Sequence, residues 1–256
     1  MTNARTARAL REQKAADMRA RAQRSQRRRR AATIAAAVLS FLVVVVGVGI
    51  VIQNLRSTNA QAAGSTPQHL TDGAILVGNP DAKVTLTLYE DFQCPVCQEF
   101  EAESGKQIAA WVADGTVKVY YRPIAILDRA SSTGYSTRAL EAAAAVVNSD
   151  PAAFQRFHDL LYANQPLEGG AGLTNAKLAE FAGQAGASAS AVSKALQDKA
   201  YTGWTKTVTS QSSQAGVTGT PTVEVNGTRL TDVGLDVLTR AVQAAEKGQP
   251  IPTTTP

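Results

Sequence analysis

The chain has 256 residues and a formal net charge of +5, a length that suits one large or two small domains. The charge is uneven: residues 1–30 hold eleven Lys or Arg against two acidic residues, a net charge of +9, so the other 226 residues carry −4. Because the part of the chain able to fold is mildly acidic, we exclude a basic nucleic-acid groove.

An uncharged apolar run, residues 31–52, follows the basic tail 1–30 and its four consecutive arginines at 27–30. Twenty-two residues are enough to cross the hydrocarbon core of a bilayer as a helix. The arginines on its N-terminal side predict a cytoplasmic tail and an extracytoplasmic location for residues 53–256. A cleavable signal peptide ending near Ala60-Gln61-Ala62 is the alternative, but its apolar region is usually shorter. We therefore expect a single-pass anchor in the cell membrane.

The segment 53–71 is small and polar, and it predicts a flexible linker in which His69 is solvated. A folded domain is expected over 72–248, and 249–256 is expected to be a frayed tail. At the start of the domain, alternating residues predict strands at 73–78 and 84–89. Helical spacing predicts a helix from the cysteines to Asp114-Gly115, and a further strand follows at 117–121.

A long helical block is expected between about residues 131 and 216. Pro151 is placed to open one of its helices, and Thr174 and either Ser188 or Ser190 are candidate N-caps. The second histidine, His158, is expected to be a partly exposed helix residue. After this block come a strand at 222–225, a hairpin turn at Asn226-Gly227 and a last helix at 236–247.

Cys94 and Cys97 are the only cysteines, and they lie between a predicted strand and a predicted helix. The free N–H groups at the start of a helix stabilise a thiolate, so Cys94 is expected to be the attacking sulfur. A structural zinc site would need four ligands, and the only histidines are His69 and His158. A static disulfide is the other alternative. The pattern favours a cysteine pair that alternates between a dithiol and a disulfide, with no metal and no cofactor. The order of the predicted elements indicates a thioredoxin-like α/β fold with a helical insertion.

Two separated motifs resemble the DsbA-like branch of the thioredoxin superfamily. They are Asp-Phe-Gln-Cys-Pro-Val-Cys at 91–97 and Gly-Val-Thr-Gly-Thr-Pro-Thr at 216–222. The resemblance covers roughly residues 70–248. It implies that Cys94 is the exposed nucleophile and Cys97 the buried resolving thiol. It also implies that Pro221 is a cis-proline facing the disulfide, which would present the Thr220 backbone to an extended substrate.

Two positions depart from that branch. Val96 stands where the best-known oxidases have a histidine, which implies a weaker oxidant. Leu88 stands where many relatives have a glutamate that accepts the proton of the buried thiol. Glu90, on the same strand face as Leu88, is a candidate proton relay in its place; the alternative is a solvated loop carboxylate.

These features predict a membrane-anchored extracytoplasmic thiol–disulfide oxidoreductase, most simply an oxidase for newly exported cysteine-containing proteins. Its reduced pair would be reoxidised by a membrane partner that the sequence does not identify. The alternatives are a reductase or isomerase and, from another class, a thiol-independent chaperone or binding module.

Overall fold

The computed structural model describes residues 65–255. The predicted tail 1–30, the predicted transmembrane helix 31–52 and most of the linker lie outside this range. Within residues 65–255, none of the helices combines the length and the apolar character that a membrane crossing requires. His69 is exposed, as expected.

A five-stranded sheet with the order β1-β3-β2-β4-β5 forms the centre of the domain. Its strands are β1 (Ile75–Val77), β2 (Val84–Glu90), β3 (Val117–Pro123), β4 (Thr222–Val225) and β5 (Thr228–Arg229). β2 pairs parallel with β3 and antiparallel with β4. The alternation predicted for β2 is confirmed, since Val84, Leu86 and Leu88 on one face are fully buried.

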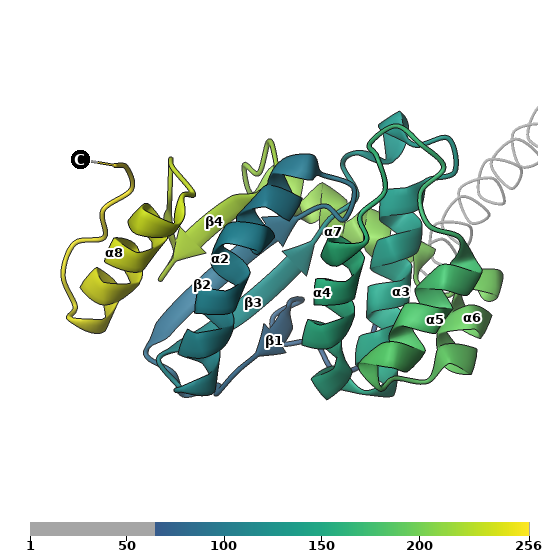
Figure 1. The fold of residues 1–256 in the computed structure, drawn as a ribbon, viewed down its shortest axis with the longest axis horizontal. Coiled ribbons are helices and arrows are strands. Elements are labelled where there is room, and N and C mark those ends of the chain that lie inside the picture. Colours follow the sequence, from purple (N-terminus) through teal and green to yellow (C-terminus); the bar gives the residue numbers. More distant parts are fainter. Residues whose placement is uncertain (1–64, 256) are drawn as a thin grey trace, which may run out of the picture. The chain divides into compact units, whose positions relative to one another are not determined.

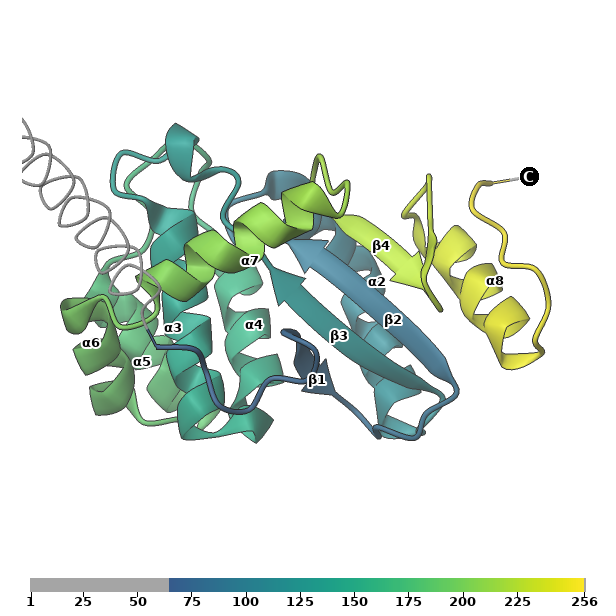
Figure 2. The same cartoon turned by 180° about the vertical axis from the view of Figure 1, so that it is seen from behind.

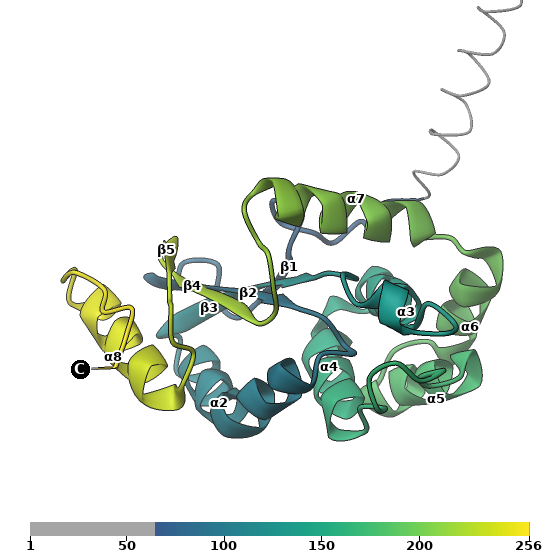
Figure 3. The ribbon, with the colours of Figure 1, turned by 90° about the horizontal axis from the view of Figure 1, so that it is seen from above.

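Helices cover both faces of the sheet. α7 (Thr202–Gln214) crosses one face, and α2 (Pro95–Ala113) and α8 (Leu235–Glu246) lie on the other (Figures 2 and 3). α2 connects β2 to β3, as the parallel pairing of these strands requires.

The predicted helical insertion lies between β3 and β4 and packs beside the sheet (Figure 1). It contains α3 (Tyr135–Ser149), α4 (Phe154–Ala163), α5 (Asn175–Ala185) and α6 (Ala189–Asp198), followed by α7. Two predicted caps are confirmed: Thr174 accepts a hydrogen bond from the Lys177 N–H, and Ser188 accepts one from the Ala191 N–H. Pro151 opens a 3-10 turn that runs into α4.

The C-terminal tail differs from the frayed segment that its composition suggested. Thr253 accepts hydrogen bonds from the backbone N–H groups of Thr231 and Asp232, and Arg240 donates to the carbonyl of Thr254. Ile251 packs against the core. These contacts hold the tail against α8 and the loop before it, because its backbone groups find partners that sequence spacing does not reveal.

Candidate active site

The two cysteines lie at the start of α2, shortly after the end of β2, as predicted. Cys94 is the N-cap residue of α2, with Pro95 at the first helical position, and both cysteines are free thiols. Cys97 is completely buried, whereas Cys94 is 6% exposed. Cys94 is therefore the more accessible sulfur, but it is more covered than the exposed nucleophile implied by the resemblance. The neighbouring Val96 is 51% exposed and marks the open side of the site.

The surroundings of Cys94 favour its thiolate. A hydrogen bond from the Cys97 thiol, opposed by burial and supported by Thr220 and the backbone N–H groups of Cys97 and Val96, lowers the pKa of Cys94 from 9.0 to about 6. The two N–H groups belong to the first turn of α2, where unpaired donors are available. At neutral pH the Cys94 sulfur is thus mainly ionised.

The surroundings of Cys97 have the opposite effect. Burial, the adjacent Cys94 and the charge of Glu90 raise the pKa of the Cys97 thiol well above its ordinary value. Cys97 therefore holds its proton while Cys94 is ionised. This asymmetry is what a thiol exchange needs, since only the thiolate attacks a disulfide.

The second motif, residues 216–222, lies beside the first, residues 91–97, because the strands next to them, β4 and β2, are neighbours in the sheet. The Thr220-Pro221 peptide bond is cis and directly precedes β4, whose Thr222 pairs with Tyr89 of β2. In its protonated form the Cys94 thiol donates a hydrogen bond to the Thr220 carbonyl, which lies 3.3 Å from the sulfur. The structure thus brings together the four predicted residues Cys94, Cys97, Thr220 and Pro221.

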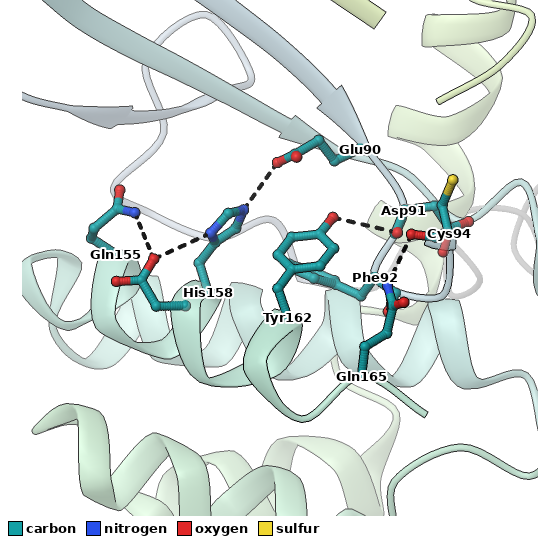
Figure 4. Close-up of polar contacts among 9 residues, drawn as sticks. Glu90, Asp91, Phe92, Cys94, Gln155, His158, Tyr162 and Gln165 are labelled. Atoms are coloured by element: carbon teal, nitrogen blue, oxygen red, sulfur yellow. Dashed lines mark hydrogen bonds and ion pairs between the residues drawn. The ribbon is translucent and has the colours of Figure 1, made fainter. Parts of the chain in front are cut away.

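Residues of the insertion and of the loop before α2 fix the backbone around Cys94. The Gln165 amide donates to the carbonyls of Cys94 and Phe92, at 2.9 and 3.2 Å (Figure 4). The carboxylate of Asp91 accepts from the N–H groups of Gln93 and Leu127. Burial raises the pKa of Asp91 to about 6. The sequence indicates no role for Gln165, because nothing in its spacing distinguishes it from an ordinary polar residue, and it indicates none for Asp91 beyond its place at the start of the first motif.

Glu90 and His158 are both buried. This finding corrects the expectation of a partly exposed His158 and excludes the solvated alternative for Glu90. Glu90 is only 2% exposed and His158 only 1% exposed, and Glu90 Oε2 lies 2.9 Å from His158 Nε2 (Figure 4). The physical reason is that β2 continues to Glu90, which pairs with Pro123 of β3. The apolar side of α4 then packs over this end of the strand, so its histidine is covered as well.

One group of side chains in residues 65–255 has a geometry that could hold a metal ion: Glu90, Glu101 and His158, whose ligand atoms lie within 4.8 Å of one another. It does not include either cysteine. The zinc alternative considered for the cysteine pair therefore gains no ligands from this group.

Comparisons with known proteins agree with this geometry. Residues 70–244 match the thioredoxin family. The reduced DsbA structure from Mycobacterium tuberculosis is 31% identical, with a TM-score of 0.60, and the match covers 71% of this chain and 95% of that one. The reduced disulfide bond oxidoreductase DsbG from the same organism is 29% identical, also with a TM-score of 0.60, over 77% of this chain and 99% of that one.

A curated relative is the serine/threonine-protein kinase PknE of Mycobacterium tuberculosis, 35% identical over 129 residues. This chain spans 23% of that kinase, and the match covers 48% of this chain. The fold, the two facing motifs and the DsbA structure lead to one conclusion: the chain belongs to the thioredoxin family and is a DsbA-like protein thiol–disulfide oxidoreductase.

Proposed function

We propose that the protein is an oxidase that transfers its Cys94–Cys97 disulfide to cysteine-containing proteins outside the cytoplasm. The observation that carries the proposal is the asymmetry of the two thiols. A Cys94 thiolate that is stable at neutral pH stabilises the reduced pair and makes Cys94 a good leaving group, both of which favour giving the disulfide away.

The transfer takes two steps. A substrate thiolate attacks Cys94 Sγ, forming a substrate–Cys94 disulfide, and the Cys94–Cys97 bond breaks as Cys97 leaves and takes up a proton. A second substrate thiolate then attacks the substrate sulfur of the mixed disulfide, and Cys94 leaves as a thiolate. The substrate dithiol is oxidised to a disulfide and the enzyme pair is reduced by two electrons.

The Thr220-Pro221 segment is the surface on which we place the substrate. It lies against Cys94 at the edge of the site and continues into β4, so an extended peptide could pair with its backbone as an added strand. Backbone pairing is independent of side-chain sequence, which suits an oxidase for many exported proteins. The reduced pair would be reoxidised by a membrane partner.

The proposed location rests on the sequence outside the described residues. The arginines at 27–30 and the apolar run 31–52 support a single-pass anchor with the catalytic domain outside. Disulfides persist in that compartment. The chain's two cysteines form the redox pair, which leaves no other cysteine for a structural disulfide within the chain.

The proposal is tested with the oxidised full-length protein and a reduced, unfolded protein that contains several cysteines. We expect disulfides to form in the substrate as the Cys94–Cys97 pair becomes reduced, and we expect Cys94→Ser to abolish this transfer. A reductase would leave the reduced substrate unchanged, and its reduced form would instead open the disulfides of an oxidised substrate while its own Cys94 and Cys97 become a disulfide. A thiol-independent chaperone would suppress substrate aggregation equally well with Ser at position 94.

A further inference from the structure

Two carboxyl groups and one imidazole lie together inside the domain, and the disulfide transfer proposed above does not use them. They belong to Glu90 at the end of β2, Glu101 in α2 and His158 in α4. Glu90 and His158 are only 2% and 1% exposed. The fold therefore brings two oxygen ligands and one nitrogen ligand, all of types that bind divalent metal ions, to one place.

The spacing of these ligand atoms is close to that of a metal site. Glu90 Oε2 lies 2.9 Å from His158 Nε2 (Figure 4), and one ligand atom from each of the three residues lies within 4.8 Å of the other two. Zinc bonds of about 2.0–2.2 Å separate tetrahedral ligands by about 3.4 Å. Small movements of the side chains therefore suffice to bring all three into contact with one ion.

The same three side chains have buried polar atoms that lack a partner. Seven side-chain atoms in residues 65–255 are buried without a hydrogen bond, and three of them are Glu90 Oε1, Glu101 Oε1 and His158 Nδ1. Buried polar atoms are almost always paired, so a group of exceptions in one place marks a missing partner. A cation would provide that partner for the two carboxylate oxygens.

The surroundings of His158 match those of a metal-binding histidine. Such histidines usually direct their second ring nitrogen at a carboxylate, which orients the ring and makes it a stronger ligand. Here Asp159 Oδ1 lies 3.7 Å from His158 Nδ1, and the Gln155 amide donates a hydrogen bond of 2.9 Å to the same oxygen. Four aromatic rings surround the imidazole, with centroids 4.7–5.8 Å from its own: Phe92, Tyr121, Phe154 and Tyr162.

A pocket between α2 and α4 gives an ion access to this cluster. Its volume is about 580 Å³, and both Glu101 and Asp159 line it. A zinc site with three protein ligands keeps a fourth position for water. The pocket provides room for that water beside Glu101.

We propose that Glu90, Glu101 and His158 form a binding site for one zinc ion, which ties β2, the redox helix α2 and the insertion helix α4 together. An imidazole beside two carboxylates suits zinc, whereas Ca²⁺ and Mg²⁺ prefer sites made of oxygen atoms alone. His158 binds the ion through Nε2 as a neutral imidazole, so binding releases the Nε2 proton to solvent. Without the metal, Glu90 and His158 pair with each other.

Zinc binding is measured by isothermal titration calorimetry on the oxidised full-length protein, made without a histidine tag. In this form Cys94 and Cys97 are joined in a disulfide, so neither can bind zinc as a thiolate. X-ray absorption at the zinc edge then identifies the ligands. We expect one zinc ion per chain, with nitrogen and oxygen atoms at about 2.0–2.2 Å and no sulfur at about 2.3 Å.

Variants assign the ion to this cluster. Asp159→Asn removes the carboxylate behind the histidine and should weaken zinc binding by about 10- to 100-fold. Because Asp159 is 60% exposed, this variant should fold normally. Glu90→Gln, Glu101→Gln and His158→Gln each remove a ligand and should weaken zinc binding more.

Three matched controls should leave zinc binding unchanged: Glu141→Gln for a buried carboxylate, Asp198→Asn for an exposed one, and His69→Gln for the other histidine of the chain. Zinc should also raise the Tm of the parent and of these controls, because a ligand that binds only the folded protein stabilises it. The Tm of Glu101→Gln should not respond to zinc.

Three results would overturn the site. One is an oxidised parent protein that binds no zinc. Another is zinc binding that is lost in His69→Gln but kept in Glu101→Gln and Asp159→Asn. The third is displacement of the zinc by an equal concentration of Ca²⁺, which would mean a site made of oxygen atoms alone. None of these results affects the proposed oxidase, because disulfide transfer depends on the two cysteines and not on this cluster.

Discussion

At the scale of single residues, the reactivity of the site is set by what surrounds two otherwise identical thiols. The Cys94 thiolate is stabilised by hydrogen bonds from the Cys97 thiol, the Thr220 side chain and the first turn of α2, whereas Cys97 is fully buried and the charge of Glu90 acts on it. Val96, between them, contributes no cation. The low pKa of Cys94 in this chain therefore comes from hydrogen bonding rather than from a neighbouring charged side chain.

The ionisation of Cys94 can be measured directly by alkylation. In the reduced protein, we expect iodoacetamide to label Cys94 with a half-maximal rate near pH 6, set by its lowered pKa, and to leave Cys97 unlabelled below pH 9. Cys97→Ala should accumulate mixed disulfides through Cys94, because no second thiol is left to release the substrate. Faster labelling of Cys97 than of Cys94 would reverse the two roles.

At the scale of elements, the insertion helix α4 does more than cover the sheet. It provides His158 beside Glu90, Tyr162 beside Asp91 and, just beyond its end, Gln165 to hold the backbone at Cys94 (Figure 4). The redox helix α2 and the insertion are therefore coupled through the end of β2.

The Glu90–His158 pair predicts a pH-dependent contribution to stability. The pKa of His158 is raised from 6.5 to about 10 in the folded protein. The stabilisation is therefore complete below pH 6.5 and is lost as the pH rises through 10. At pH 6.5 we expect His158→Gln to lower the free energy of unfolding by about 3 kcal/mol, as for a broken buried pair.

Urea unfolding of the parent and of His158→Gln at pH 6.5, 8 and 10 measures this contribution. The difference between the two proteins should shrink with increasing pH. A difference that stays constant across this range would mean that His158 stabilises the fold by packing alone. The exposed pair of Lys194 and Asp198 offers a control, since Asp198→Asn should change stability by less than about 1 kcal/mol.

The sequence predicted well those elements whose signals are local. The alternation of 84–89, the Asn226-Gly227 turn, the Thr174 and Ser188 caps and the helix start at the cysteines are all confirmed. Each of these depends on residues within a few positions of one another. The meeting of Cys94 with Thr220-Pro221 was expected only through the family resemblance.

The contacts that sequence reasoning missed are those that tertiary packing creates. Glu90 and His158 are 68 residues apart, and Gln165 and Cys94 are 71 apart. His158 looked like a partly exposed helix residue because its neighbours Arg156 and Asp159 are charged, yet its own side of α4 faces the sheet. Likewise, the carboxy-terminal segment 249–255 has the composition of a loose end, but its partners lie around residues 231–240.

At the scale of the whole molecule, the charge differs between the strongly basic first thirty residues and the mildly acidic remainder. This difference predicts that the two parts of the chain lie on opposite sides of a membrane. We expect residues 53–256 to be outside the cytoplasm and attached to the membrane. A reporter enzyme that is active only outside the cytoplasm, fused after Pro256, should be active. Activity of a cytoplasm-only reporter at the same site would contradict this topology, and a soluble form beginning near Ala63 would indicate cleavage rather than anchoring.

The most direct test of the central claim, that Cys94 and Cys97 form an oxidising pair, is the reduction potential of this disulfide. It is measured by equilibrating the full-length protein with glutathione redox buffers at pH 7. A nucleophile with a pKa near 6 lies between the values of about 7 for thioredoxin and about 3.5 for DsbA. We therefore expect a potential between about −230 and −120 mV, above the value of about −270 mV for thioredoxin. A potential of about −270 mV or lower would contradict the account and identify the protein as a reductase.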